Sequence, residues 1–355
     1  MDILVGMSGG VDSSTAALLL KEAGHNVIGA TMAIWGDKGM SVKINPSSHG
    51  ACLGPDEKED IESAKKVCEE LGIEFHVFDC ASKYDEIVLK NFRDEYLKGR
   101  TPNPCVWCNS LIKFDVLPYI AKENGLKFDK FATGHYARVE KVDDRYLLKR
   151  GVNPHKDQSY FLYRLKQRQL ENILLPLGGY TKKEIRQIAS KAGLEVADKP
   201  DSQDFYEGDY NELLGVSPKH GNIVDMSGKV LGEHEGVWNY TIGQRKGLGI
   251  SSTEALYVVE LRGETNEVVV GFKDKTFKDR LVADDLNWIA FDKLEGEIKC
   301  QAKIRSTQTP TDVTVRPIGE DKIEVVFDDM QKSIAPGQSV VLYDGDVVLG
   351  GGIIE

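Results

Sequence analysis

The sequence has no long apolar run free of charged residues, no internal repeat and no low-complexity segment. No stretch approaches the ~20 apolar residues of a membrane-spanning helix, so we expect no membrane partner. The chain starts with a strand-like segment and lacks the basic residues, apolar core and cleavage site of a secretion signal. Six cysteines among 355 residues are too few for a disulfide-stabilised secreted fold. We therefore predict a cytoplasmic protein with two or three domains.

The chain also lacks an overall excess of positive charge, and its net charge of −11 argues by itself against a nucleic-acid partner. The charge is unevenly distributed, however. Residues 149–191, which we call the basic block, contain ten Lys and Arg residues against three acidic ones. Such a block is most often a solvated helix face, but inside an acidic chain it also marks where a polyanion could dock.

The segment Ser-Gly-Gly-Val-Asp-Ser-Ser at 8–14 follows an apolar strand and precedes an Ala- and Leu-rich helix. It lacks the lysine of the GxxxxGK[ST] phosphate loop and so does not fit that ATPase pattern. Paired glycines let backbone N–H groups approach an anion, and the helix N-terminus adds partial positive charge and the hydroxyls of Ser13 and Ser14. Asp12 needs neutralisation there, which Mg²⁺ shared with pyrophosphate oxygens would provide. The alternative is a tight turn without a ligand, which this combination of residues disfavours.

Strand-like and helix-like segments alternate in the first part of the chain. Strands are expected over 27–32, 74–78 and 128–132, and a helix over 60–71. This alternation predicts a parallel sheet with helices on both faces, whose ligands bind at the carboxyl ends of strands. The opening loop, Met32 and Gly134 fall at such ends, so we expect them to converge on one nucleotide.

From about residue 280 onward, alternation with a period of two dominates. Ile298, Cys300, Ala302 and Ile304 share one predicted strand face, and an Asp-Gly turn follows at 344–345. Short strands with turn signals predict a small barrel or sandwich. We therefore predict an α/β chain with a nucleotide-binding and catalytic domain (1–205), a small central domain (206–278) and a C-terminal β-domain (279–355).

A Cys-x-x-Cys pair, Cys105 and Cys108, follows two prolines in the segment 101–109. Pro102 and Pro104 exclude regular helix before the pair and stiffen the chain, so the cysteines sit on a defined turn. The pair is compatible with a redox couple, half of a zinc site, iron–sulfur ligands, or a nucleophile with a neighbour. The sequence has no second Cys-x-x-Cys and no His-x-x-x-His, which argues against a complete zinc site formed by local spacing.

Seven motifs occur in an order that resembles the tRNA-specific 2-thiouridylases. They are SGGVDSS (8–14), TPNPCVWCN (101–109), ATGHYAR (132–138), KDQSYFLY (156–163), LPLGGYTKKEIR (175–186), GQRKGLGI (243–250) and APGQSVVLYDGDVVLGGGII (335–354). The resemblance spans nearly the whole chain. It implies an N-terminal PP-loop domain of the adenine nucleotide α-hydrolase type, a tRNA-contacting central domain and a C-terminal β-barrel.

The resemblance also implies a reaction. ATP adenylates O2 of the wobble uridine of tRNA and releases pyrophosphate, and sulfur then displaces AMP to leave 2-thiouridine. The implied cofactors are ATP and Mg²⁺, and the implied partners are the anticodon region of tRNA and a sulfur donor, either a cysteine desulfurase relay or sulfide. The oligomeric state is not indicated.

Individual residues receive roles from the same resemblance. It implies that Cys108 is the catalytic cysteine, with Cys105 beside it and Asp12 in the nucleotide loop. The implied nucleotide contacts are Gly6, Met7, Ser8, Gly9, Gly10, Val11, Asp12, Ser13, Ser14, Met32 and Gly134. The implied contacts to the target base are Asn103, Pro104 and Cys105, and those to the rest of the tRNA are His135, Lys156, Asp157, Gln158, Arg305, Ser306 and Gln338. A base that is modified must also leave its stack.

This chain departs from the family pattern at two points. Cys105 stands where many members have Asp, and segment 201–210, which carries a second cysteine in those members, has none here. Two hypotheses for sulfur therefore stay open. Either Cys105, Cys108 and Cys52 ligate a 4Fe–4S cluster with one iron open for sulfide, or Cys105 and Cys108 act alone, one as a persulfide and the other as the resolving thiol. Cys68 and Cys300 are predicted core residues, whereas Cys80 ends a strand and has no predicted role.

Two other functions are compatible with parts of the sequence. An ATP-dependent amide or amidine ligase would use the opening loop but would need no cysteine on a proline-stiffened turn. A non-catalytic tRNA-binding or iron–sulfur protein would leave the opening loop without a purpose.

Overall fold

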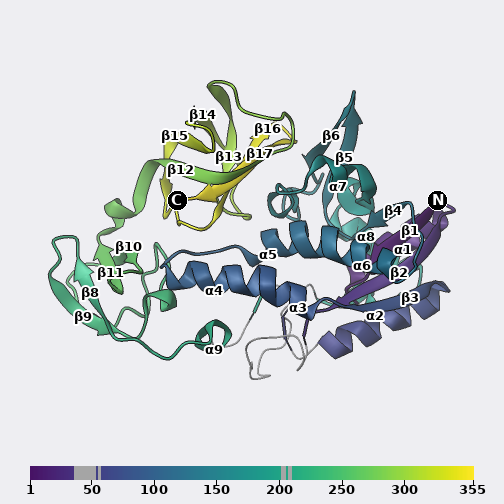
Figure 1. Ribbon diagram of the computed structural model, residues 1–355, viewed down its shortest axis with the longest axis horizontal. Helices are drawn as coiled ribbons and strands as arrows, with labels where there is room; N and C mark the ends of the chain where they lie inside the picture. Colours follow the sequence, from purple (N-terminus) through teal and green to yellow (C-terminus); the bar gives the residue numbers. More distant parts are fainter. Residues whose placement is uncertain (36–52, 55–56, 201–204, 207–209) are drawn as a thin grey trace.

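The computed structural model describes residues 1–35, 53–54, 57–200, 205–206 and 210–355. A five-stranded sheet forms the N-terminal part, with every strand pairing parallel (Figure 1). Its strand order is β3 (Glu74–Asp79), β2 (Asn26–Ala33), β1 (Asp2–Gly6), β4 (Lys130–Ala132) and β7 (Ile173–Leu174). Ile3, Leu4 and Val5 of β1 are fully buried, as a central strand covered on both faces must be. The predicted parallel sheet is confirmed.

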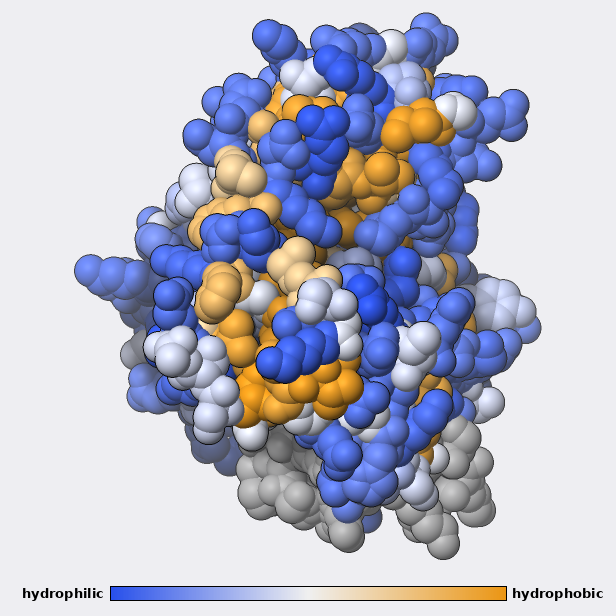
Figure 2. All heavy atoms as spheres, turned by 90° about the vertical axis from the view of Figure 1, so that its left-hand side faces the viewer, coloured by the Kyte–Doolittle hydropathy of each residue, from blue (hydrophilic) through white to orange (hydrophobic). Residues whose placement is uncertain are grey.

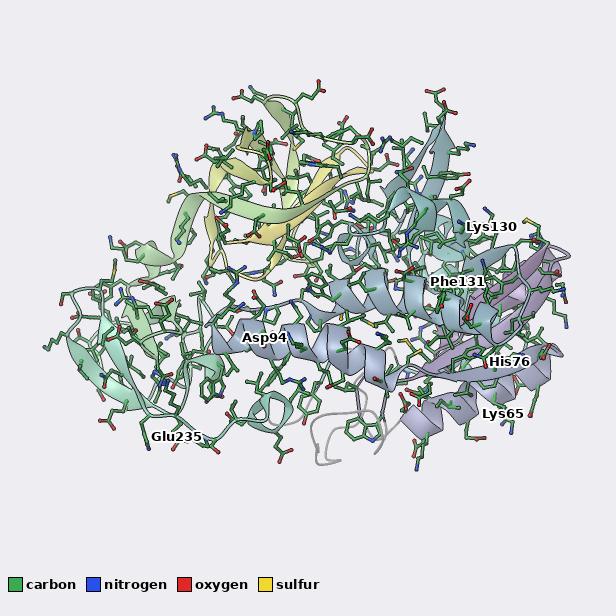
Figure 3. All side chains as sticks on the ribbon, viewed as in Figure 1. Lys65, His76, Asp94, Lys130, Phe131 and Glu235 are labelled. Atoms are coloured by element: carbon green, nitrogen blue, oxygen red, sulfur yellow. The ribbon has the colours of Figure 1, made fainter. Side chains whose placement is uncertain are left out.

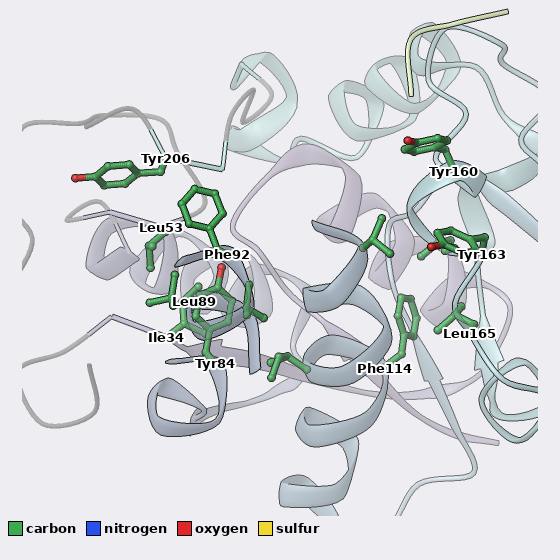
Figure 4. Close-up of a cluster of buried hydrophobic side chains, with 14 of the residues drawn as sticks. Ile34, Leu53, Tyr84, Leu89, Phe92, Phe114, Tyr160, Tyr163, Leu165 and Tyr206 are labelled. Atoms are coloured by element: carbon green, nitrogen blue, oxygen red, sulfur yellow. The ribbon is translucent and has the colours of Figure 1, made fainter. Parts of the chain in front are cut away.

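Helices cover both faces of this sheet. One face packs against α1 (Val11–Glu22), α2 (Glu57–Leu71) and α8 (Lys182–Lys191), and Ile3 and Val5 lie in the core between them. The other face packs against α3 (Ala81–Tyr84), the π-helical η1 (Asp85–Leu89), α4 (Lys90–Leu97) and α6 (Leu117–Glu123), with Leu4 and Ile28 in that core. Figure 4 shows part of this second core on two sides of the helix that carries Phe114.

The helix that carries both cysteines of the pair is built from three consecutive segments. It begins as α5 (Pro104–Trp107), continues as the π-helical η2 (Cys108–Val116) and ends as α6. Pro104 occupies the first helical position, where a missing N–H costs nothing, and Asn103 before it is extended. π-Helical turns are rare and frequently lie at functional sites. Cys108 is the first residue of this one.

Short connecting elements lie between the sheet and the C-terminal part. They are β5 (Ala137–Val142), β6 (Arg145–Arg150), η3 (Ser159–Phe161), α7 (Gln167–Asn172), η4 (Pro176–Gly179), η5 (Glu195–Asp198), α9 (Tyr210–Leu214), η6 (Val237–Asn239) and η7 (Lys273–Thr276). The central part is a four-stranded sheet with strand order β10 (Tyr257–Arg262), β11 (Glu267–Gly271), β8 (Gly221–Asp225) and β9 (Val230–His234).

The C-terminal part is a closed barrel of six antiparallel strands. The strands are β12 (Phe277–Trp288), β13 (Ile298–Lys303), β14 (Thr311–Ile318), β15 (Lys322–Lys332), β16 (Ser339–Asp344) and β17 (Val347–Ile354). The order β12-β15-β14-β13-β16-β17 closes because β12 also pairs with β17. Closure removes the exposed sheet edges that would otherwise attract other chains.

The barrel interior follows the predicted alternation. Ala302 and Ile304 lie in its core, Ile298 and Cys300 pack against them from the same strand face, and the turn between β16 and β17 falls at the predicted Asp-Gly pair. The barrel, rather than a sandwich, is therefore the observed form.

The β5–β6 hairpin joins the barrel although its sequence lies between β4 and β7. Lys149 of β6 pairs with Val347 of β17, and Arg138 of β5 forms an ion pair with Asp346. Figure 3 shows side chains from both parts in the region between the barrel and this hairpin. The hairpin thus links the parallel-sheet part to the barrel.

The end of the molecule formed by β8 to β11 shows apolar surface in Figure 2. Met226, Val230 and Phe272 are each about half exposed there. Elsewhere, no helix in the described part of the chain has the length and apolar character needed to cross a membrane.

Candidate active site

The opening loop, residues 7–10, lies between the carboxyl end of β1 and the first turn of α1. Gly9 has φ of +70°, and a Cβ at Gly9 would lie 2.4 Å from the carbonyl oxygen of Asp60, so only glycine fits. Gly10 is the N-cap of α1 and has no side chain to cap the helix. The main-chain N–H groups of the first turn are therefore the donors that this loop offers to an anion.

The serines of the loop shape it from within. The Ser13 and Ser14 hydroxyls donate to the carbonyl oxygen of Gly10 at 3.2 and 2.8 Å, and both side chains are buried. Ser13 Oγ also accepts the N–H of Ser8 at 3.1 Å. In the structure these hydrogen bonds hold the loop backbone, and the predicted contact of the two hydroxyls with an anion stays a prediction.

Gly134 and Met32 lie at the same edge of the sheet as the loop. A Cβ at Gly134 would lie 2.7 Å from the Asp12 carbonyl carbon and the Ser13 nitrogen, so the backbone after β4 contacts the start of α1. Met32 lies near the carboxyl end of β2, beside β1. The strand ends expected to converge on one nucleotide do lie together.

Asp12 is held by two residues that the sequence did not single out. Lys182 Nζ lies 2.7 and 2.8 Å from the two carboxylate oxygens of Asp12, and the Tyr136 hydroxyl donates to one of them at 2.7 Å. Lys182 is 170 residues from Asp12 in the sequence, and it is the first residue of α8. In the sequence, Lys182 stood out only as a member of the basic block and of the motif at 175–186.

A second lysine supports the loop from another side. Lys199 Nζ donates to the carbonyl oxygen of Gly9 at 3.2 Å and contacts Asp60 at 2.8 Å. Ser63 of α2 donates to the same carbonyl at 3.1 Å. Two separate segments, α2 and the chain at Lys199, therefore fix the Gly-Gly turn.

The cysteine pair lies one helical turn apart, and both thiols are half-buried. Residues three apart in a helix share a face, so Cys105 and Cys108 are directed to the same side. Cys80, which follows β3, lies near Cys108: burial first, and then the charges of Asp79 and Cys108, raise the pKa of the Cys80 thiol to about 12. The cysteine pair therefore belongs to the same carboxyl edge of the sheet as the opening loop.

The remaining cysteines fall outside this cluster. Cys68 is fully buried in the core of α2 and Cys300 packs against the barrel core, and burial raises the pKa of each to about 12. The predicted core position of Cys68 is confirmed, whereas Cys300 is half-buried at the edge of the barrel core. Cys52, the hypothetical third cluster ligand, lies outside the described residues. Within the described ranges, no three His, Cys, Asp or Glu side chains are grouped so that they could hold a metal ion.

An aromatic cavity of about 550 Å³ opens beside the cysteine segment. Its walls are Phe92, Tyr96, Pro102, Pro104, Phe205, Tyr206 and Tyr210. Pro102 and Pro104 flank Asn103, which the resemblance places at the target base. No pattern in the sequence predicted that α4 and α9 would supply aromatic side chains here.

His135, which the resemblance places among the tRNA contacts, is buried in the structure. Its Nδ1 is 2.8 Å from the Thr133 hydroxyl, and its ring packs against Phe114, which also meets Phe131 of β4. Burial, and then the charge of Lys113, holds the pKa of His135 well below its usual value of 6.5. The buried imidazole is therefore neutral near pH 7.

Asp157 and Gln158 also have partners within the chain. Asp157 is buried and accepts N–H groups from Gly151 and Ser159 at 3.1 Å, together with the Arg150 guanidinium at 3.2 Å. Gln158 accepts the N–H of Tyr136 at 2.9 Å. Their observed contacts shape the turn that carries Tyr136, which in turn holds the Asp12 carboxylate.

The residues of the barrel that the resemblance assigns to tRNA lie in two different surroundings. Arg305 is exposed and donates to the carbonyl oxygen of Ser333 at 2.7 Å, and Ser306 beside it is half-buried. Gln338 is half-buried and donates its amide to the carbonyls of Thr101 and Pro102. The structure therefore brings Gln338 to the cysteine segment, together with Asn103, Pro104 and Cys105.

The basic block is less free than its composition suggested. At least five of its ten cations form ion pairs with carboxylates in the described part of the chain: Lys149, Arg150, Arg164, Arg168 and Lys182. Arg164 also lies 4.5 Å from the ring centroid of Trp107, between the two cysteines in sequence. Much of the positive charge of the basic block is therefore neutralised by carboxylates of the chain, which leaves less of it to attract a polyanion.

Comparison with known proteins assigns the chain to a protein family. Three family models match consecutive parts: the tRNA methyl transferase HUP domain at 1–206, the tRNA methyl transferase PRC-barrel domain at 212–272 and the aminomethyltransferase beta-barrel domain at 278–354. The tRNA-specific 2-thiouridylase MnmA of Endomicrobium trichonymphae is 47% identical over 360 residues, covering 100% of this chain and 99% of that protein. The proteins of the same name from Clostridium botulinum (47%) and Caldanaerobacter subterraneus (48%) each match 99% of this chain and 97% of their own length. The chain belongs to the family of tRNA-specific 2-thiouridylases.

Proposed function

We propose that this chain is a tRNA-uridine 2-sulfurtransferase, which adenylates O2 of the wobble uridine with ATP and then replaces that oxygen with sulfur. The full-length relatedness to the 2-thiouridylases carries the proposal. The geometry supports it, because the anion-binding loop follows β1 while Cys108 lies beside Cys80 at the end of β3. A nucleotide and a sulfur-carrying thiol could thus act at one edge of the sheet.

The chemistry requires a better leaving group than a pyrimidine carbonyl oxygen. Uridine O2 attacks the α-phosphorus of ATP, and the bond from that phosphorus to pyrophosphate breaks. Sulfur then attacks C2, and the C2–O bond breaks to release AMP. The products are 2-thiouridine, AMP and pyrophosphate.

We assign the departing pyrophosphate to the opening loop. The N–H groups at the start of α1 would bind its oxygens, with Lys182 supplying positive charge close by. Asp12 would hold the Mg²⁺ that accompanies ATP and neutralises phosphate charge. Met32 and Gly134 would border the rest of the nucleotide.

We further propose that the three parts of the chain have different roles. Residues 1–205 would carry the nucleotide and cysteine chemistry, 206–278 would contact tRNA, and 279–355 would contact tRNA and support the cysteine segment. Asn103, Pro104 and Cys105 would meet the flipped uridine beside the aromatic cavity, and Lys156, Arg305 and Ser306 would contact the tRNA further away.

Two sulfur routes remain as competing proposals. Cys105 and Cys108, with Cys52 as third ligand, would hold a 4Fe–4S cluster that delivers sulfide, or the pair would act alone through a persulfide and its resolving thiol. Anaerobic purification with iron and sulfide analysis separates them. A cluster-free preparation that is fully active with a persulfide donor would eliminate the cluster route.

The variant Cys108→Ser tests the proposed function. We expect loss of 2-thiouridine in tRNA hydrolysates, measured by nucleoside mass spectrometry, while tRNA-dependent pyrophosphate release persists. Cys300→Ser, a half-buried cysteine in the barrel, is the matched control and should retain thiolation. Unchanged thiolation in Cys108→Ser would remove Cys108 from the sulfur chemistry. Absence of 2-thiouridine with the wild type, while pyrophosphate release persists in both proteins, would favour an amide or amidine ligase, and absence of pyrophosphate release from the wild type would favour a binding protein.

A further inference from the structure

The turn that leads into the cysteine segment is clamped by the barrel. Gln338 Nε2 donates to the carbonyl oxygens of Thr101 at 2.9 Å and Pro102 at 3.2 Å. The N–H of Thr101 donates in return to the carbonyl oxygen of Pro336 at 2.7 Å. These bonds join positions separated by more than 230 residues in the sequence.

The backbones on both sides of this turn are in direct contact. Gly337 has φ of +89°, and a Cβ there would lie 2.9 Å from the Thr101 nitrogen. On the other side, a Cβ at Gly263, which follows β10, would lie 2.5 Å from the Lys98 carbonyl. The turn at 98–102 is therefore held between the central sheet and the barrel.

The chain between this clamp and the cysteines is stiff. Pro102 and Pro104 have fixed φ angles and are buried, and Asn103 between them is extended. Cys105 follows Pro104 directly, inside the first helical turn. With so few soft torsions in between, a displacement of the Pro102 carbonyl moves the start of the helix that carries both thiols.

The bonding of Gln338 leaves it poorly suited to hold tRNA phosphates. Both of its partners are carbonyl oxygens, so the amide nitrogen faces them and both N–H protons are used. The remaining amide oxygen is an acceptor, which cannot bond a phosphate oxygen.

We infer that Gln338 is a positioning residue for the segment Thr101–Cys108, and that the barrel acts on the reaction through this clamp. This inference rests on the proposed function in one respect only, since the proposed function assigns the sulfur chemistry to that segment. It differs from the tRNA contact that the family resemblance implies for Gln338.

Gln338→Glu and Gln338→Met test the inference without tRNA or ATP. The Glu variant sets a carboxylate against two carbonyl oxygens, and the Met variant removes the donors without adding charge. We expect iodoacetamide to alkylate Cys105 and Cys108 about fivefold faster in both, since the freed turn exposes the half-buried thiols. Mass spectrometry of the peptide containing both cysteines gives the rates, and circular dichroism verifies folding.

Gln308→Glu is the matched control. Gln308 is also half-buried in the barrel part and donates its amide at 2.8 Å to the side-chain oxygen of Gln331, with no bond to the turn among its described contacts. It should leave the alkylation rate unchanged. In tRNA assays, Gln338→Met should lower kcat for thiolation while the Kd for tRNA stays within about twofold.

Unchanged alkylation in both Gln338 variants, with weakened tRNA binding, would overturn the inference and assign Gln338 to tRNA. Because the alkylation measurement uses neither substrate, it can fail while thiolation stands, or succeed if the chain catalyses a different reaction.

Discussion

Replacing Lys182 by methionine removes the ammonium that faces Asp12 but keeps most of the side-chain volume. In the folded chain, Lys182 Nζ contacts both carboxylate oxygens of Asp12, and the two side chains are 13% and 30% exposed. Methionine would leave a negative carboxylate beside the loop that we assign to pyrophosphate. We expect weaker productive binding of ATP as the main consequence.

The size of the effect follows from the geometry. A hydrogen bond to a charged group contributes about 1.5–3 kcal/mol, and full burial would push the loss higher. Partial exposure of Asp12 screens the charge, and the Tyr136 hydroxyl still donates to it. An intermediate loss of about 2 kcal/mol corresponds to a roughly 30-fold lower kcat/KM for ATP.

The assay is tRNA-dependent pyrophosphate release over a range of ATP concentrations. Arg93→Met is the matched control. Arg93, on α4, forms an ion pair with Asp85 at 3.3 Å, and this pair is buried to a similar degree as the pair between Lys182 and Asp12. Both variants should lower the melting temperature to a similar degree, but Lys182→Met alone should lose kcat/KM for ATP. Equal ATP kinetics in the two variants would show that Lys182 is a structural ion pair without a role at the nucleotide.

Three further changes test other parts of the site. Gly134→Ala places a methyl group against the start of α1 and should weaken ATP binding at least about tenfold, as measured by titration calorimetry. Gly179→Ala is the control and should not weaken it, because a Cβ at Gly179 would meet nothing within 4 Å. Equal ATP affinities in the two variants would refute the close contact at Gly134. His135 is neutral when folded and its pKa lies below the ~6.5 of the unfolded chain, so protons favour unfolding. Stability should therefore fall as the pH drops below about 6.5, by up to roughly 1.4 kcal/mol per pH unit. His135→Gln should flatten this slope in urea titrations and exposed His155→Gln should not; an unchanged slope in His135→Gln would contradict the assignment. Cys80→Ala should retain thiolation because the thiol is 1% exposed with its pKa raised to about 12; loss of 2-thiouridine with normal folding would make Cys80 a sulfur carrier.

The parts of the site that the sequence predicted are those encoded by neighbouring residues. The Gly-Gly turn after an apolar strand, and a cysteine pair after two prolines, depend on backbone freedom within a few positions. Periodicity likewise predicted the parallel sheet and the inward face of β13, because alternation and helical spacing are local properties.

The parts that sequence reasoning missed depend on contacts between distant segments. The pair between Asp12 and Lys182 joins the opening loop to α8, and no local pattern gives that pairing. The Mg²⁺ role of Asp12 stays a proposal. No pattern in the sequence indicated that tertiary packing buries His135 and Asp157; their contact with tRNA stays a prediction. Charge counting overestimated the freedom of the basic block for the same reason, since it could not show which cations face carboxylates.

The most direct test of the central claim is the stoichiometry of a single reaction mixture. Wild-type protein would be incubated with unmodified tRNA, ATP, Mg²⁺ and a sulfur source, and 2-thiouridine, AMP and pyrophosphate would be measured together. We predict equal amounts of the three products, with 2-thiouridine at the wobble position alone. Pyrophosphate and AMP formed without any 2-thiouridine, with persulfide and sulfide donors alike, would contradict the proposed sulfur transfer.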